Sequence, residues 1–179
     1  MAGKNHYQIL KLETPNGVDS IIQSLATLHA TKNVDERGRQ KWIYIKTPQI
    51  RDHTNTLLNM VSTHPVRRCD VRLKEYEDSS VNESIGKQGL AVCTIEKDPR
   101  IIRTGNGVSD YQEARPGSIV IITPMTYNKA RIWLAQIGEP FSESSFVDAG
   151  KEDMVVILPN TKFRLKVPYY LMARPVKDV

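Results

Sequence analysis

The segment TKFRLKV, residues 161–167, has the spacing in this sequence that most directly suggests a chemical role. Its three basic side chains alternate with three apolar ones: Lys162, Arg164 and Lys166 against Phe163, Leu165 and Val167. Alternate residues of a β-strand point to opposite faces, so the cations would form one row with about 6–7 Å between neighbours. Such a row suits the successive phosphates of a nucleic acid, or an acidic protein surface. The alternative is a solvated strand face, or a sheet edge that lysines protect from aggregation.

A second basic row is predicted in residues 66–76, which alternate in the same way. Arg68, Arg72 and Lys74 share one face of this segment, and Asp70 interrupts them. If both rows lay on one side of the molecule, they would form a nucleic-acid platform. The aromatic residues expected near it are few: Tyr127, Tyr169 and Tyr170. Base stacking would therefore contribute little to this platform.

Motifs for metal binding, phosphate binding or nucleophilic catalysis are missing from the sequence. The four histidines do not form a HExxH or HxH arrangement, and no Cys or His pair has zinc-ligand spacing. The stretch TGNGVS, residues 104–109, has two glycines without the pattern of a phosphate-binding loop. We therefore expect no metal site and no cofactor on the main interpretation.

Three stretches occur in an order that resembles the ADP-ribosyltransferase family: IIRTG, TPMTYNKA and KEDMVVILPNTKFRL, within residues 101–167. The family uses an Arg on an early strand, a Ser/Thr-rich strand, and a Glu-x-Glu before an apolar strand. The resemblance implies that Arg103 contacts the diphosphate of NAD, that Thr126 supports the nicotinamide-ribose site, and that Glu152 is the first acid. Met154 stands where the second acid would be, so the relative would be either active or catalytically degenerate.

Composition and charge set the limits of these interpretations. The chain has 179 residues and a formal net charge of +5, enough for one domain or two small lobes with a mild preference for phosphate-rich partners. Its longest apolar runs are far shorter than the ~20 residues of a membrane span. The N-terminus lacks an apolar signal core, which predicts a cytoplasmic location, with a virion as the alternative.

The first half of the sequence predicts alternating strands and helices. Strands are expected at residues 6–12, 41–46 and 66–76, with helices between them. The first helix would bury Ile21, Ile22, Leu25 and Leu28. The second would begin with Thr47 as N-cap and Pro48 as its first residue, and would bury Ile50, Leu57, Met60 and Val61.

The second half predicts short strands broken by Pro, Gly and Asn, as in a partial barrel or sandwich. Residues 151–167 are expected to form two strands that turn at Pro159 and Asn160, while residues 126–138 fit either a helix or a strand. The predicted fold is thus α+β, with a βαβαβ half packed on a β-rich half. The expected domains are residues 1–80 and 81–179, or one continuous domain, since residues 77–89 are polar and rich in turn formers.

These patterns favour a non-enzymatic binding or assembly protein that uses basic strand faces to contact nucleic acid or partner proteins. A structural component of a viral or other large assembly fits this description, and so does a homo-oligomer. The alternative is the ADP-ribosyltransferase-like domain, with NAD as its cofactor.

Overall fold

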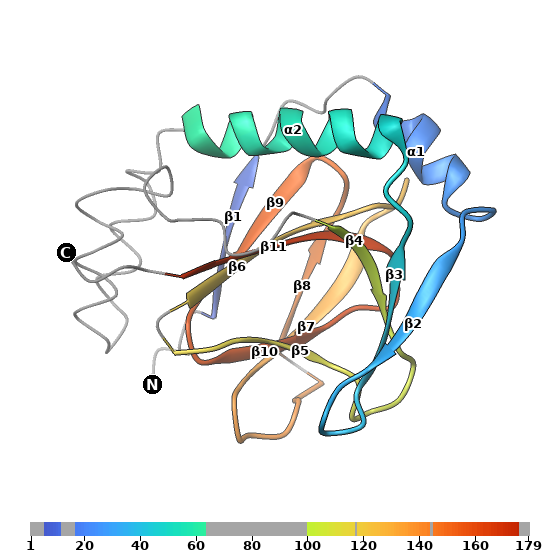
Figure 1. Cartoon of the computed structure of the whole chain (residues 1–179). Coiled ribbons are helices and arrows are strands. Elements are labelled where there is room, and N and C mark those ends of the chain that lie inside the picture. Colours follow the sequence, from blue (N-terminus) through green and yellow to red (C-terminus); the bar gives the residue numbers. More distant parts are fainter. Residues whose placement is uncertain (1–5, 12–16, 64–99, 117, 144, 176–179) are drawn as a thin grey trace.

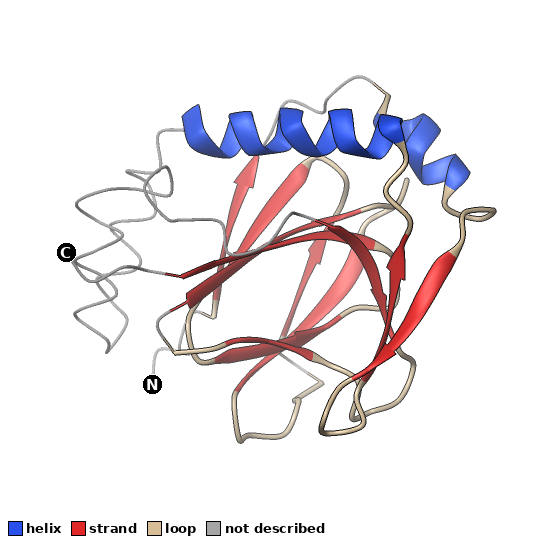
Figure 2. Ribbon diagram, in the orientation of Figure 1, coloured by secondary structure: helices blue, strands red, loops and turns tan. Residues whose placement is uncertain are grey.

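The structure is a computed structural model that describes residues 6–11, 17–63, 100–116, 118–143 and 145–175. Within these residues the chain is mostly β-strand with two helices (Figures 1 and 2). In chain order the elements are β1 (Tyr7–Lys11), α1 (Val18–Ser24), β2 (Ala30–Val34), β3 (Gln40–Tyr44), α2 (Pro48–Thr63), β4 (Arg100–Thr104), β5 (Gln112–Ala114), β6 (Ser118–Pro124), β7 (Ala130–Gln136), β8 (Phe146–Ala149), β9 (Asp153–Ile157), β10 (Thr161–Arg164) and β11 (Tyr169–Pro175). A β-rich α+β fold is confirmed.

The strands form two antiparallel sheets. The large sheet has seven strands in the order β1-β9-β6-β11-β4-β3-β2, and the small sheet has four in the order β5-β10-β7-β8. Strands from the two halves of the sequence are neighbours in the large sheet, because β1 pairs with β9 and β3 pairs with β4. The boundary expected between residues 80 and 81 lies outside the described residues.

The main core lies between the two sheets. Buried side chains from both sheets form one cluster: Ile102, Ala114, Val120, Ile122, Ile132, Leu134, Val147, Ala149, Val155, Ile157, Phe163, Leu165 and Tyr169. The Tyr169 hydroxyl lies 2.7 Å from Thr104 Oγ1, so the one polar atom of this ring has a partner inside the core. Burial raises the pKa of Tyr169, although its hydrogen bond with Thr104 acts in the opposite direction.

A second apolar cluster lies between the helices and the other face of the large sheet. Its buried members are Val18, Ile21, Leu25, Ile50, Leu57, Ile101, Met125 and Tyr170. Two neighbouring residues of β11 belong to different cores, because Tyr169 faces the small sheet and Tyr170 faces α2. The molecule therefore has three layers: helices, large sheet and small sheet (Figure 1).

Helix α2 begins as its sequence predicts. The amide of Ile50 donates to Thr47 Oγ1 at 3.2 Å, and Pro48 is the first helical residue. Ile50 and Leu57 are each 2% exposed, which confirms that they face inward. The side chains of Met60 and Val61 lie outside the described residues.

Other predicted elements differ in the structure. Helix α1 ends at Ser24, so Leu28 lies beyond it. Strand β2 begins at Ala30 and pairs with β3 as an antiparallel hairpin. Strands β1 and β2 lie at opposite edges of the large sheet. The strand expected at residues 66–76 lies outside the described residues, so the βαβαβ order is not confirmed.

The turn at residues 159–160 is present, but it joins strands of different sheets. Asn160 has a φ of 61°, a left-handed conformation that Asn tolerates better than most residues. The strand before the turn, β9, belongs to the large sheet, and the strand after it, β10, belongs to the small sheet. The two strands expected in residues 151–167 and the turn between them are therefore confirmed, and the structure adds that the strands belong to different sheets. Residues 130–136, where helix and strand were both open, form β7.

His53 is buried on the inner face of α2, and this position predicts a pH-dependent stability. It is 6% exposed, it stacks on Tyr170 at 5.2 Å, and neither ring nitrogen has a hydrogen-bond partner among the residues that the structure describes. Burial lowers the pKa of His53. Below about pH 6.5 the unfolded chain binds a proton at His53 that the folded chain does not bind. The free energy of unfolding therefore decreases as the pH decreases, until the pH reaches the lowered pKa of His53 in the folded chain.

We expect the free energy of unfolding to fall by up to about 1.4 kcal/mol per pH unit from this residue within that window. Urea titrations between neutral and mildly acidic pH should show a shallower fall for His53→Gln than for the parent chain. His29→Gln is the matched control, because the side chain of His29 is exposed. Equal pH dependence in the parent and His53→Gln would contradict the prediction.

Candidate functional site

The outer face of the small sheet carries the basic row. Phe163 and Leu165 are 0% and 1% exposed and point into the core, whereas Lys162 and Arg164 are half-buried and Lys166 is exposed on the opposite face. The predicted alternation of residues 162–166 is therefore confirmed. No helix of the described residues covers this face of the small sheet (Figures 1 and 2).

Three aromatic rings lie among these cations. Lys162 Nζ lies 5.0 Å from the ring centre of Tyr111 and 4.7 Å from that of Phe141. The Arg164 guanidinium lies 4.9 Å from Phe141 and 5.3 Å from Trp133, and Lys166 Nζ lies 5.9 Å from Trp133. We call this set the basic–aromatic face: Tyr111, Trp133, Phe141, Lys162, Arg164 and Lys166.

The β pairing explains how distant residues reach this face. Trp133 lies opposite Arg164 in the β7–β10 register, so both point outward. Tyr111 precedes β5, which pairs with the other edge of β10, and Phe141 lies in the connection between β7 and β8. Tyr111 and Phe141 also contact each other edge to face, with ring centres 6.0 Å apart. The rings therefore form a supported surface.

The three cations of the row lack acidic partners. Among the residues that the structure describes, no carboxylate forms an ion pair with Lys162, Arg164 or Lys166. Arg131, on the neighbouring strand, is different, because it pairs with Asp148 at 3.3 Å while stacking on Phe146. Cation–π contacts hold the cations of the row in place without neutralising their charge.

Glu113 lies opposite Lys162 in the β5–β10 register, yet other cations neutralise it. Its carboxylate is 6% exposed and lies 3.2 Å from both Arg37 and Arg39. Arg39 also donates to Asp35 at 2.6 Å and stacks over Tyr111. Burial alone would raise the pKa of Asp35, but hydrogen bonds from Arg39 and Arg37 hold it below its ordinary value.

This acidic–basic cluster lines one wall of a cleft of about 810 Å³, between the β2–β3 turn and β5. Three arginines and three carboxylates line it: Arg37, Arg39, Arg115, Asp35, Glu36 and Glu113. Their formal charges cancel. Among the described residues, the lining of the cleft thus carries no net formal charge, whereas the basic–aromatic face carries three cations.

The aromatic residues that sequence reasoning placed beside the basic row lie elsewhere. Tyr169 and Tyr170 are both 0% exposed and belong to the two cores. Tyr127 is 57% exposed, but its hydroxyl donates to the carbonyl of Asp19 in α1. Three other aromatic side chains, Tyr111, Trp133 and Phe141, lie next to the row instead. The strand reading of residues 130–136 is the signal that could have found Trp133.

The second predicted row, formed by Arg68, Arg72 and Lys74, lies outside the described residues. Whether it extends the basic–aromatic face is therefore left as a prediction.

The residues that the ADP-ribosyltransferase resemblance singles out have separate surroundings. Arg103, on β4, stacks over Trp42 at 4.6 Å. Thr126 lies in the turn after β6 and Glu152 in the turn before β9, and both turns reach α1 through contacts with Asp19. Among the described contacts, none joins Arg103 to Thr126 or Glu152.

Met154 occupies the position of the second acid in that resemblance, and it is fully buried in β9. Its neighbour Asp153 is also buried, and its carboxylate accepts from the amide of Gly150 at 2.9 Å, which closes the turn. A carboxylate at position 154 would need a charge partner in the core. The local structure thus uses this segment for packing and for a turn.

Two further findings concern metals and membranes, and both apply to the described residues only. No three His, Cys, Asp or Glu side chains come together there in a way that could hold a metal ion. Neither helix is long and apolar enough to cross a bilayer.

The sequence matches no model of a known protein family and no curated protein. Two solved structures are similar at the level of the chain path. A candidate oxygenase from Shewanella oneidensis aligns with a TM-score of 0.45 and 8% identity over 98% of this chain and 82% of that one. The non-heme alpha-ketoglutarate-dependent epimerase SnoN from nogalamycin biosynthesis aligns with a TM-score of 0.44 and 8% identity over 96% and 77%. Nothing about the activity of this chain follows from likenesses at this distance.

Proposed function

We propose that the basic–aromatic face binds single-stranded nucleic acid. The observation that carries the proposal is the packing of Lys162, Arg164 and Lys166 among three aromatic rings on one sheet face, with no carboxylate of the described residues paired to them. Proteins that bind single strands combine cations that follow the backbone with rings on which bases stack. The row supplies the first component, and Trp133, Phe141 and Tyr111 supply the second.

A single strand suits this surface better than a duplex. In a duplex the flat faces of the bases are stacked on one another, whereas a single strand can present them to aromatic side chains. The row runs from Lys162 on β10 to Lys166, two residues after that strand ends at Arg164. Such a surface would contact a short stretch of backbone without reading its sequence. If the protein is part of a larger assembly, this face would hold the nucleic-acid component.

The proposal is tested by removing the charge of the row and measuring how binding depends on salt. The variant is Lys162→Gln/Arg164→Gln/Lys166→Gln, and the ligand is a fluorescent oligo(dT) titrated at several salt concentrations. Each phosphate contact on a single strand contributes about 0.7 to the slope of log K against log salt. We expect the variant to lose about 2 from that slope and to bind more weakly at low salt.

The control carries the same change in net charge elsewhere on the surface: Lys32→Gln/Arg51→Gln/Lys129→Gln, three exposed cations that are not part of the basic–aromatic face. It should keep most of the salt slope. An equal loss in both triple variants would mean that net charge and not this face attracts the oligonucleotide. If the parent chain does not bind oligo(dT), or if salt does not affect the binding, the proposal is rejected and an acidic protein partner is favoured.

A further inference from the structure

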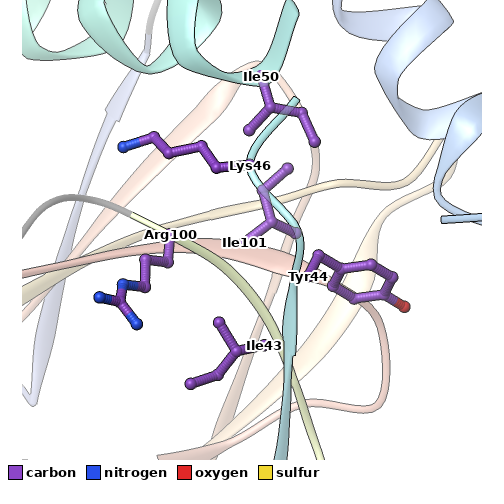
Figure 3. A pocket seen from close by; sticks show the side chains of 6 residues that line it. All are labelled: Ile43, Tyr44, Lys46, Ile50, Arg100 and Ile101. Carbon is purple, nitrogen blue, oxygen red and sulfur yellow. The ribbon is translucent and has the colours of Figure 1, made fainter. Parts of the chain in front are cut away.

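A second candidate site lies where the start of α2 meets β3 and β4 of the large sheet. A pocket of about 220 Å³ is lined by the end of β3, the first turn of α2 and the start of β4: Ile43, Tyr44, Lys46, Ile50, Arg100 and Ile101 (Figure 3). Ile50 and Ile101 are 2% and 1% exposed, so their side chains are part of the helix–sheet core. The pocket therefore rests on residues that the fold holds rigidly.

The two cations of the pocket, Lys46 and Arg100, lie on the same side of β3 (Figure 3). Figure 3 shows the amine of Lys46 and the guanidinium of Arg100 on one side of β3, while the Tyr44 ring points to the other side. Within the described part of the chain, neither cation forms an ion pair, and no acidic residue lines the pocket. Two positive side chains that line one pocket, neither of them paired with a carboxylate of the described residues, repel one another. An anion between them would remove that repulsion.

The apolar part of the pocket adds a second requirement. Three isoleucines, Ile43, Ile50 and Ile101, line it next to the cations. A fully hydrated ion such as free phosphate would leave this apolar surface uncovered. A ligand with an anionic group and an apolar body would satisfy both parts, since small-molecule sites commonly combine an apolar lining with a few polar groups that fix orientation.

We infer that this pocket binds a small organic anion, a phosphate or carboxylate attached to an apolar group. Lys46 and Arg100 hold the anionic group, and the isoleucines contact the apolar body. The site is separate from the basic–aromatic face, which lies on the small sheet, so the two can fail or succeed independently.

The test is an NMR titration of the full chain with ¹³C-labelled isoleucine methyl groups. Phenyl phosphate and benzoate are the probes, with inorganic phosphate and phenol as the two half-ligands. We expect saturable shifts concentrated on the methyl groups of Ile43, Ile50 and Ile101, with either organic anion binding more tightly than its half-ligands. The comparison of phenyl phosphate with benzoate decides which anionic group the pocket prefers.

Lys46→Gln and Arg100→Gln should each weaken binding by about fivefold, as expected for a partly exposed charge contact. Arg51→Gln is the matched control, because Arg51 is an exposed cation on α2 that does not line the pocket. The triple variant of residues 162, 164 and 166 should bind both probes as the parent does, which separates this site from the proposed nucleic-acid face. Absence of saturable shifts, or equal weakening by Arg51→Gln, would overturn the inference.

Discussion

Replacing Phe163 with Ala is expected to lower the free energy of unfolding by about 3–5 kcal/mol, the usual cost of removing a buried phenyl ring. Phe163 is 0% exposed and contacts Tyr169 edge to face at 6.2 Å, between the small sheet and the large sheet. Its truncation would leave a cavity that the surrounding strands cannot close without breaking their pairings. Urea denaturation followed by circular dichroism measures the change.

Phe141→Ala is the matched control for this prediction. Phe141 is half-buried on the outer face of the same sheet, where it contacts Tyr111, Lys162 and Arg164. Its loss removes contact area without opening a cavity in the core, so its effect on stability should be less than half that of Phe163→Ala. Equal losses for the two variants would show that the small sheet does not pack on the large sheet through Phe163.

Local signals in the sequence predicted local structure well. Thr47 and Pro48 mark the start of α2 because the hydrogen bond from Ile50 to Thr47 involves neighbours only three residues apart. The alternation in residues 162–166 predicts which side chains face outward, because the period of a strand is two residues regardless of its partners. Both signals depend on the chain within a few residues of the feature.

Sheet membership could not be predicted in the same way. Strands β9 and β10 are joined by only three residues, 158–160, which favours a hairpin, yet they belong to different sheets. Strand β9 pairs with β1 and β6. All five of its residues are buried, so both of its faces must be covered by other elements. A strand buried on both faces needs a helix layer on one side and a sheet on the other, and residues far away in the sequence supply them.

The candidate site follows the same division. The cations of residues 162–166 were predicted because they are close in sequence, on β10 and just after it. The rings come from β7, from the connection after it and from the residue before β5. Tyr169 and Tyr170 are close to the row in sequence, but they belong to a strand of the other sheet. Nearness in sequence thus suggested the wrong aromatic residues, and the register of β10 with its two neighbours selects Trp133 and Tyr111.

The two tryptophans of the chain offer the sharpest test of which face binds nucleic acid. Each is half-buried and contacts two cations: Trp133 contacts Arg164 and Lys166 on the small sheet, and Trp42 contacts Lys32 and Arg103 on the large sheet. We expect Trp133→Ala to weaken the binding of oligo(dT) by about 5- to 150-fold, because stacking on one aromatic ring contributes about 1–3 kcal/mol per base. Trp42→Ala, the matched control, should change the affinity less than twofold.

Fluorescence gives the same test an independent measurement. In Trp42→Phe, Trp133 is the only tryptophan, and stacking of a base on its ring should quench its emission in proportion to the oligonucleotide bound. In Trp133→Phe, the remaining Trp42 should keep its emission when oligo(dT) is added. The opposite pattern, with Trp42 quenched and Trp133 unchanged, would move the binding site to the Lys32–Trp42–Arg103 patch on the large sheet. It would also mean that three cations with three rings bind oligo(dT) more weakly than two cations with one ring. The proposal assumes the opposite, namely that each charge contact and each stacked ring adds to the affinity.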